Sequence, residues 1–186
     1  MKKVEHGKTF DRNAATPPAF EIFHNTVTEG YPEHWHTAIE IIMPTRGEYE
    51  VVVGKDSYNL KEGDIIMINS GVVHGMRFVS QGERIVMLVE PGCVENQEEM
   101  ETIFLRLPAI YFKKEDEEDP FYLFLRSQIL ELVREYDNEG AVMTHRICTG
   151  LKELFSEFGR KGFSDANAQN TFGAMKQQEY IEAVLS

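Results

Sequence analysis

The sequence predicts a mainly β domain, rolled into a barrel or sandwich, that is followed by an antiparallel pair of helices. Short segments between residues 20 and 90 are rich in aromatic and β-branched side chains, and glycine-marked turns separate them. Residues 65–68 are apolar at every position, which is typical of a strand with packed protein on both faces. Between residues 120 and 158 apolar side chains recur every three or four residues, the period of an amphipathic helix.

The expected strands follow one another with short turns. Gly54-Lys55-Asp56 is a tight-turn signal, and Gly63 can take a positive φ in a second turn without strain. Pro91-Gly92 ends the series. The strands are predicted at residues 20–28, 38–45, 47–53, 57–60, 65–69, 73–79 and 83–90.

Helices are predicted in the second half of the chain. Residues 95–107 form a plausible short helix that ends before Pro108. Asp119 is a good N-cap and Pro120 suits the first helical position, so a helix is expected over 120–137. After a polar turn, a second helix is expected over 141–158, and the two form an antiparallel hairpin. Residues 164–171 are small and polar like a linker, and a third helical pattern begins near residue 175.

Two histidines two residues apart precede a glutamate, and a further histidine lies on a later segment. On one strand His34, His36 and Glu40 share a face because side chains alternate, and His74 would join them from another strand. Three imidazoles and one carboxylate can hold a divalent transition metal, and zinc, nickel, manganese and iron all accept such ligands. Without a metal, the same four groups would form a hydrogen-bonded floor for an organic ligand.

Three further residues are candidates for the wall of a ligand pocket beside these four. They are His24, Tyr49 and Arg77, and a surface position would explain each of them equally well. No catalytic residue is predicted.

At these residues the segment from about 28 to 90 resembles the cupin double-stranded β-barrel, a jelly-roll fold. The first cupin motif is matched by His34, His36, Glu40 and Gly47, and the second by Gly63, Gly71 and His74. The usual proline of the second motif is replaced by Asn69 and its closing asparagine by Phe78. The resemblance implies that the four metal-ligand positions of the family are occupied here.

A cupin barrel, a helical hairpin and a linker into another helix resemble the amino-terminal half of AraC-type transcription regulators. This resemblance implies a flexible arm at residues 1–18, a barrel at 19–92 and a helical region at 93–163 whose hairpin, residues 120–158, pairs two subunits. It also implies that residues 164–186 lead to a carboxy-terminal DNA-binding domain absent from this sequence. The expected partners are therefore a small-molecule effector, for example a sugar-like one, and a second copy of the chain.

The charge balance argues against nucleic-acid binding by this segment itself. Lys and Arg total 19 against 31 Asp and Glu, which gives a net charge of −12 and would repel a phosphate backbone. Cys93 and Cys148 are far apart and follow no metal or redox spacing, which favours a reducing compartment. Neither a secretion signal nor a membrane-spanning run is apparent, so a cytoplasmic location without membrane contact is expected.

Two functions compete on these observations. The first is the ligand-sensing, dimerising domain of an AraC-type regulator, which is not an enzyme, and the helical hairpin favours it. The second is a metal-dependent cupin enzyme, such as a dioxygenase or isomerase, and the complete ligand set favours it. A storage or structural cupin ranks last. We expect the sensor.

Overall fold

A computed structural model of the protein describes residues 19–27, 29–93, 109–114, 118–138 and 142–161. The expected arm at 1–18, the short helix at 95–107 and the linker and third helix at 164–186 lie outside the described residues. The elements are β1 (Phe20–Val27), β2 (Tyr31–His34), β3 (Ile39–Arg46), β4 (Tyr49–Val53), β5 (Asp56–Leu60), β6 (Ile65–Ile68), β7 (His74–Phe78), β8 (Gly82–Val89), a 3-10 turn η1 (Pro91–Cys93), β9 (Ala109–Phe112), α2 (Pro120–Asp137) and α3 (Met143–Lys161).

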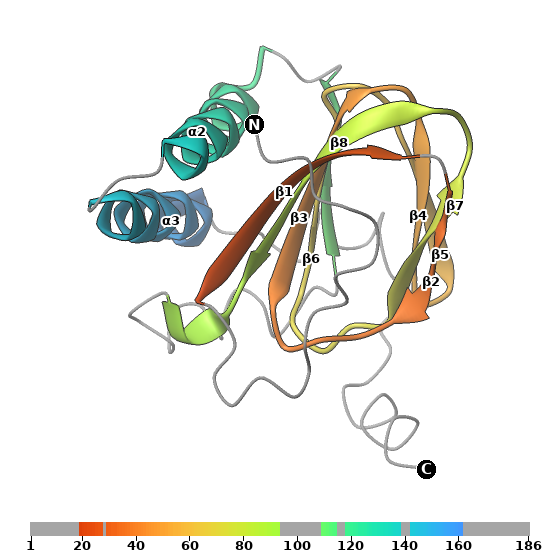
Figure 1. The fold of residues 1–186 in the computed structure, drawn as a ribbon, viewed down its shortest axis with the longest axis horizontal. Coiled ribbons are helices and arrows are strands. Elements are labelled where there is room, and N and C mark those ends of the chain that lie inside the picture. Colours follow the sequence, from red (N-terminus) through yellow and green to blue (C-terminus); the bar gives the residue numbers. More distant parts are fainter. Residues whose placement is uncertain (1–18, 28, 94–108, 115–117, 139–141, 162–186) are drawn as a thin grey trace.

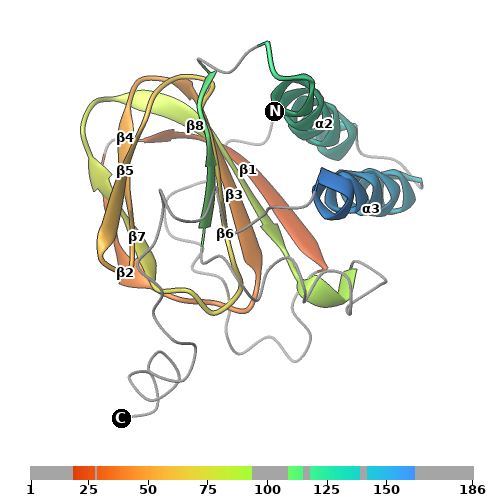
Figure 2. The same cartoon turned by 180° about the vertical axis from the view of Figure 1, so that it is seen from behind.

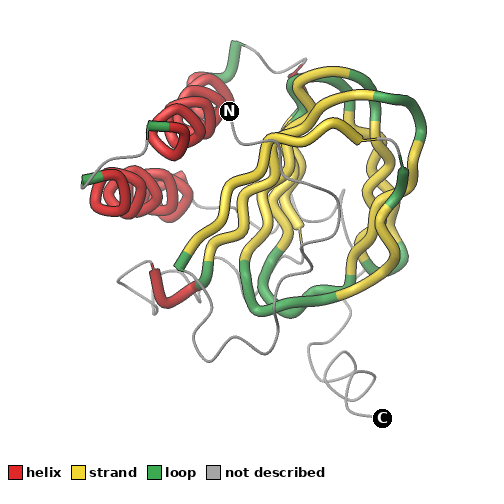
Figure 3. The backbone as a smooth tube through the Cα atoms, in the orientation of Figure 1, coloured by secondary structure: helices red, strands yellow, loops and turns green. Residues whose placement is uncertain are grey.

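The strands form two antiparallel sheets that face each other, so the described fold is mainly β with two helices (Figure 1). The larger sheet has the order β1-β8-β3-β6-β9 and the smaller sheet the order β2-β7-β4-β5. The tube drawing shows the chain passing between the two sheets through loops at both ends of the sandwich (Figure 3). Both helices cover the outer face of the larger sheet, as the view from behind also shows (Figure 2).

The strand predicted to be apolar on both faces, β6, does contact protein on both sides. Ile65 and Met67 belong to the apolar cluster between the larger sheet and the helices. Ile66 and Ile68 belong to the second cluster, between the two sheets. The larger sheet is therefore the central layer of three, and each of its inner strands divides its side chains between two cores.

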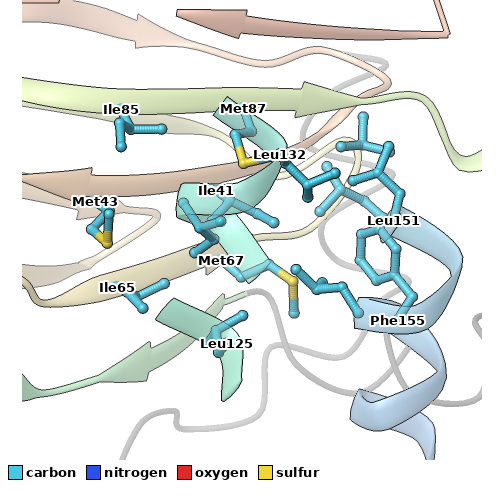
Figure 4. Packing of buried hydrophobic residues seen from close by; sticks show 14 of the residues in the cluster. Ile41, Met43, Ile65, Met67, Ile85, Met87, Leu125, Leu132, Leu151 and Phe155 are labelled. Carbon is cyan, nitrogen blue, oxygen red and sulfur yellow. The ribbon is translucent and has the colours of Figure 1, made fainter. Parts of the chain in front are cut away.

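The helical pair agrees with the sequence prediction in position and in apolar face. Asp119 accepts a hydrogen bond from the amide of Phe121 at 2.8 Å, which caps α2. Leu125, Leu132, Leu151 and Phe155 meet the sheet residues of the first cluster (Figure 4).

The contacts between α2 and α3 show that the two helices are antiparallel, because the start of α3 lies beside the end of α2. Arg146, early in α3, pairs with Glu135, late in α2. Further along α3, a Cβ on Gly150 would lie 2.9 Å from the Leu132 side chain, so the glycine permits a close approach of the two helices.

Two strands and one helix end differ from the sequence prediction. β2 was missed because it contains a proline and is mostly exposed, and β9 because it is only four residues long. α3 continues to Lys161, past Gly159, where the prediction had ended it at residue 158. The idea that one strand carries residues 34 to 40 is wrong, since regular pairing stops at His34 and resumes at Ile39.

The turn before β6 is held by a buried carboxylate. Gly63 adopts φ +87° and lets the chain reverse, and Asp64 then accepts hydrogen bonds from the amides of Lys61 and Lys114 and from the Tyr111 hydroxyl. Lys114 and Tyr111 come from the region of β9, so Asp64 ties that strand to the turn. The role of Asp64 in the fold is therefore structural. Among the described residues, no helix combines the length and apolar content that crossing a membrane would require.

Candidate metal centre

The four predicted ligands meet between the two sheets, at the point where the chain crosses from one sheet to the other. His34 ends β2 and His74 begins β7, and the two are paired partners in the smaller sheet. Glu40 projects from β3 of the larger sheet, and His36 lies in the crossing segment. One ligand atom from each of the four lies within 4.8 Å of the others. The crossing segment, rather than a continuous strand, thus brings them together.

Backbone carbonyl groups fix the orientation of all three imidazole rings. The Nδ1 atom of His34 lies 3.0 Å from the carbonyl oxygen of Pro32, and the Nδ1 of His74 lies 2.8 Å from that of Val72. The Nδ1 of His36 lies 2.9 Å from the carbonyl oxygen of its neighbour at position 38. Because a carbonyl only accepts, each Nδ1 carries a proton. Each Nε2 can therefore bind a metal when the ring is neutral, or donate a hydrogen bond when the ring is doubly protonated. Such outer hydrogen bonds are the usual support of metal-bound histidine.

Glu40 is the charged hub of the group. It is buried, and its Oε2 atom lies 2.9 Å from the Nε2 atoms of both His36 and His74. Burial by itself raises the pKa of Glu40, but hydrogen bonds from the two imidazoles outweigh it and hold that pKa well below its usual value. Glu40 is therefore ionised at neutral pH.

The three imidazoles differ in their preference for a proton. Burial lowers the pKa of His74, but its hydrogen bond with Glu40 and the charge of that carboxylate raise it by more, so the net direction is upward. Burial and the neighbouring His74 lower the pKa of His34. With His34 half-buried at the rim and His74 fully buried, the group reaches from the protein surface into the interior.

The donor set fits a divalent transition metal. Three imidazole nitrogens and one carboxylate oxygen within 4.8 Å of one another are the donor types that such a metal binds, and these four residues would hold it. Three nitrogen ligands and one oxygen ligand leave the choice among zinc, nickel, manganese and iron open.

The three residues predicted for a pocket wall lie in different places. Tyr49 is buried on the inner face of β4, with its ring centroid 5.6 Å from the Arg84 guanidinium carbon. His24 pairs with Ile85, which faces the helices, and its Nε2 lies 3.3 Å from the Thr45 hydroxyl. The structure does not bring His24 to the centre, because its side chain shares the outward face of the larger sheet.

Arg77 is also turned away from the centre. On β7 it directly follows Met76, which faces inward as His74 does, so the side chain of Arg77 points to the exterior. Its side chain is 64% exposed and forms an ion pair with Glu50 at 3.0 Å.

Three polar residues that the sequence did not single out face the space between the sheets. Arg84 on β8 is 7% exposed and pairs across the sheet with Asn25 of β1, and Tyr58 on β5 lies among the apolar side chains of the inner cluster. Burial raises the pKa of Tyr58 to about 12, so its hydroxyl stays protonated. The signal available in the sequence was parity, since Arg84 lies at two-residue intervals from the inward residues Val86 and Leu88 and so shares their face.

Comparison with known proteins supports the cupin assignment for part of the chain. The family described as "Cupin domain" matches residues 25–90, which include all four candidate ligands. No match was found among curated proteins.

Solved structures resemble parts of the chain at low identity. A protein of unknown function from Streptococcus pyogenes, SPY1581, is 18% identical with a TM-score of 0.35, covering 39% of this chain and 63% of its own. A cupin-2 domain containing protein from Shewanella frigidimarina is 16% identical with a TM-score of 0.36, covering 41% and 76%. Oxalate decarboxylase from Bacillus subtilis, described for its Mn(II) centres, is 16% identical with a TM-score of 0.36, covering 39% and 21%. This chain thus spans less than two thirds of the first and third of these proteins. Its residues 25–90 form a cupin domain.

Proposed function

We propose that this chain is the ligand-sensing and dimerisation domain of an AraC-type transcription regulator, with a divalent metal centre in its cupin fold. The observation that carries the proposal is the convergence of His34, His36, Glu40 and His74 between the two sheets. In this proposal the two sheets close as a cupin barrel around the bound effector. DNA contact belongs to a carboxy-terminal domain outside this chain, in keeping with the acidic charge of the segment.

The position of the helices supports a sensing role. They cover the face of the larger sheet opposite to the one that carries Glu40. An effector that binds two arrangements of the sheet unequally would therefore also bias the helices, which is the requirement for a ligand to act as a signal.

Dimerisation through α2 and α3 would use the apolar side chains that the fold leaves exposed. Leu123 and Leu130 lie seven residues apart on one side of α2 and are 50% and 37% exposed. Leu132 and Leu151, in contrast, are buried within the protomer. A second copy that covers Leu123 and Leu130 is the partner we propose. Size-exclusion chromatography of Leu123→Asp should then show monomers, whereas an unchanged dimer would move the interface elsewhere.

A metal-dependent enzyme is the alternative, and the complete ligand set favours it. When bound, a divalent metal would supply Lewis-acid polarisation of a substrate oxygen. The chain's own part would be to hold that metal on oriented imidazoles and to keep Glu40 ionised. The two functions differ in one result: a sensor returns its bound ligand unchanged, and an enzyme converts it.

Metal analysis tests the centre itself. Purified protein reloaded with zinc or manganese and then desalted should contain about one metal ion per chain. The double variant His36→Ala, His74→Ala should lose that metal. His24→Ala is the matched control, since this histidine lies on the opposite face of the sheet, and it should retain the metal. Equal metal content in all three proteins would refute the assignment. Sequencing of the gene beyond residue 186 tests the regulator, which requires a basic helix-turn-helix region.

A further inference from the structure

The interior between the sheets contains buried polar atoms without partners. Among the described residues, three buried side-chain atoms have no hydrogen bond: Asn25 Oδ1, Tyr58 Oη and Arg84 Nε. All three side chains face the space between the sheets. Asn25 and Arg84 are directly paired on β1 and β8 and so share a face, and Tyr58 belongs to the inner cluster. Since nearly all buried polar groups in proteins are hydrogen-bonded, two such atoms on the inner face of the larger sheet and one on the inner face of the smaller sheet indicate a missing polar occupant.

Arg84 is the strongest of the three signals. Its guanidinium is buried, yet no carboxylate in the described part of the chain forms an ion pair with it. Its one hydrogen-bond acceptor given by the structure is the Met76 sulfur, which lies 2.6 Å from Nη1. A thioether is a weak acceptor, and a buried charge is costly unless it is paired. A carboxylate would be a far better partner for this fork of donors.

The guanidinium also lies near the metal centre. Met76, which it contacts, is two residues beyond His74 on the same face of β7. Same-face neighbours on a strand are roughly 7 Å apart. Tyr58, Val51 and Met76 form one row across the smaller sheet, so the free Tyr58 hydroxyl is in the same layer as the Arg84 contact. The metal centre and this polar layer are therefore neighbours along the interior.

Charge distinguishes an anionic occupant from a neutral one. Without a metal, Glu40 and Arg84 are opposite buried charges: burial lowers the pKa of Arg84, and the charge of Glu40 opposes part of that shift. When a divalent metal joins three neutral imidazoles, its charge and that of Arg84 face a single carboxylate. An uncharged sugar would leave this excess positive charge in place, whereas a ligand with two negative charges would balance it.

We propose that the interior binds a short-chain dicarboxylate, with one carboxylate at the metal and the other at Arg84 in place of the Met76 sulfur. The unbranched Met76 side chain can swing away from the guanidinium with little strain. The Tyr58 hydroxyl donates to the ligand, and the Asn25 amide lies beside Arg84 to contact a substituent on it. The proposal rests on the proposed metal centre and names the class of ligand for that site.

The test uses the cobalt-loaded protein, whose visible absorption reports ligands that bind the metal. Malonate and succinate should change this absorption saturably and raise the melting temperature, whereas erythritol, an uncharged polyol, should do neither. Arg84→Met should keep its cobalt and bind the dicarboxylates about tenfold or more weakly. Arg46→Met removes an exposed arginine that pairs with Glu83 and should bind them like the unaltered protein.

The outcomes separate the dicarboxylate proposal from the metal proposal. No saturable binding of either acid, equal binding by Arg84→Met, or equally tight binding of erythritol would overturn the dicarboxylate. If no cobalt binds, the metal proposal fails, and calorimetric titration of succinate into the unaltered and Arg84→Met proteins decides the Arg84 contact alone. Should Arg84→Met fail to fold, Arg84→Lys keeps the charge without the fork and is expected to bind succinate several-fold more weakly. Unchanged binding by Arg84→Lys would then count against the proposal.

Discussion

Replacing Glu40 by glutamine would separate the role of its charge from that of its size. One oxygen of this buried carboxylate accepts two hydrogen bonds of 2.9 Å, from His36 and His74. Hydrogen bonds to charged groups contribute about 1.5–3 kcal/mol each. Glutamine has nearly the same volume and retains weaker versions of both bonds. We therefore expect the metal-free variant to lose about 2–4 kcal/mol of unfolding free energy, or roughly 5–15 °C in melting temperature.

The same substitution should also weaken metal binding. A neutral amide oxygen is a poor substitute for the only anionic ligand of the centre. Changes to residues that merely support a metal ligand cost about 10–100-fold in affinity, so the loss here should be at least as large. Competition with a chromogenic chelator would measure it, and urea denaturation in the presence of a chelator would measure the stability.

Glu50→Gln provides a matched control. One oxygen of Glu50 also accepts two side-chain hydrogen bonds, from Ser57 and Arg77, but on the exposed face of the smaller sheet. Exposed ion pairs contribute about 0–1 kcal/mol, so this variant should remain close to the unaltered protein in stability and in metal affinity. If the two variants behaved alike, the account of Glu40 as the charged hub would be refuted.

Three further predictions concern pH and packing. In the metal-free protein the lowered pKa of Glu40 and the raised pKa of His74 should both stabilise the fold fully between about pH 4.5 and 6.5. The contribution of Glu40 is lost as the pH falls through the acid range, and that of His74 is lost as the pH rises through its raised pKa. Urea denaturation with a chelator measures this dependence, and a flat stability profile would contradict it. Leu151→Ala should cost about 2–5 kcal/mol by chemical denaturation and the exposed Val142→Ala less than about 0.5 kcal/mol, so equal losses would mean that α3 does not pack as described. Gly82→Ala should destabilise the protein by about 1–3 kcal/mol in the same assay, because the new Cβ would overlap the Arg46 carbonyl oxygen and the Tyr49 hydroxyl; a neutral result would exclude this close approach.

Local signals explain why the sequence predicted the helical pair and most strands. The Asp119-Pro120 start and the apolar period of α2 are contained within a few neighbouring residues, and the structure reproduces them. β2 has no such signal, because its proline and exposed side chains are typical of a loop. The crossing at residues 35–38 depends on how two sheets stack, which no local pattern encodes.

The pocket residues show a similar division between local and long-range information. Arg77 could have been placed outside from the sequence, because it alternates with His74 on the same strand. The outward face of His24 could not, since it follows from the pairing of β1 with β8, some sixty residues later. Arginine in a strand is usually exposed, so the sequence does not single out Arg84. It is an interior charge because the face of β8 that it shares with Val86 and Leu88 is buried.

The division of the ligands between two sheets gives the centre a mechanical consequence. His34 and His74 belong to the smaller sheet, and Glu40 belongs to β3 of the larger one. On β3 the residues on either side of Glu40, Ile39 and Ile41, lie in the cluster that supports the helices. Consecutive residues of a strand share one backbone, so a ligand that displaces Glu40 must also displace the side chains beneath α2 and α3. The smaller sheet has no helix on its outer face among the described residues, so movement of His34 or His74 would not displace the side chains beneath α2 and α3 in this way. In the proposed sensor, a signal from the interior would therefore have its shortest path to the helices through Glu40.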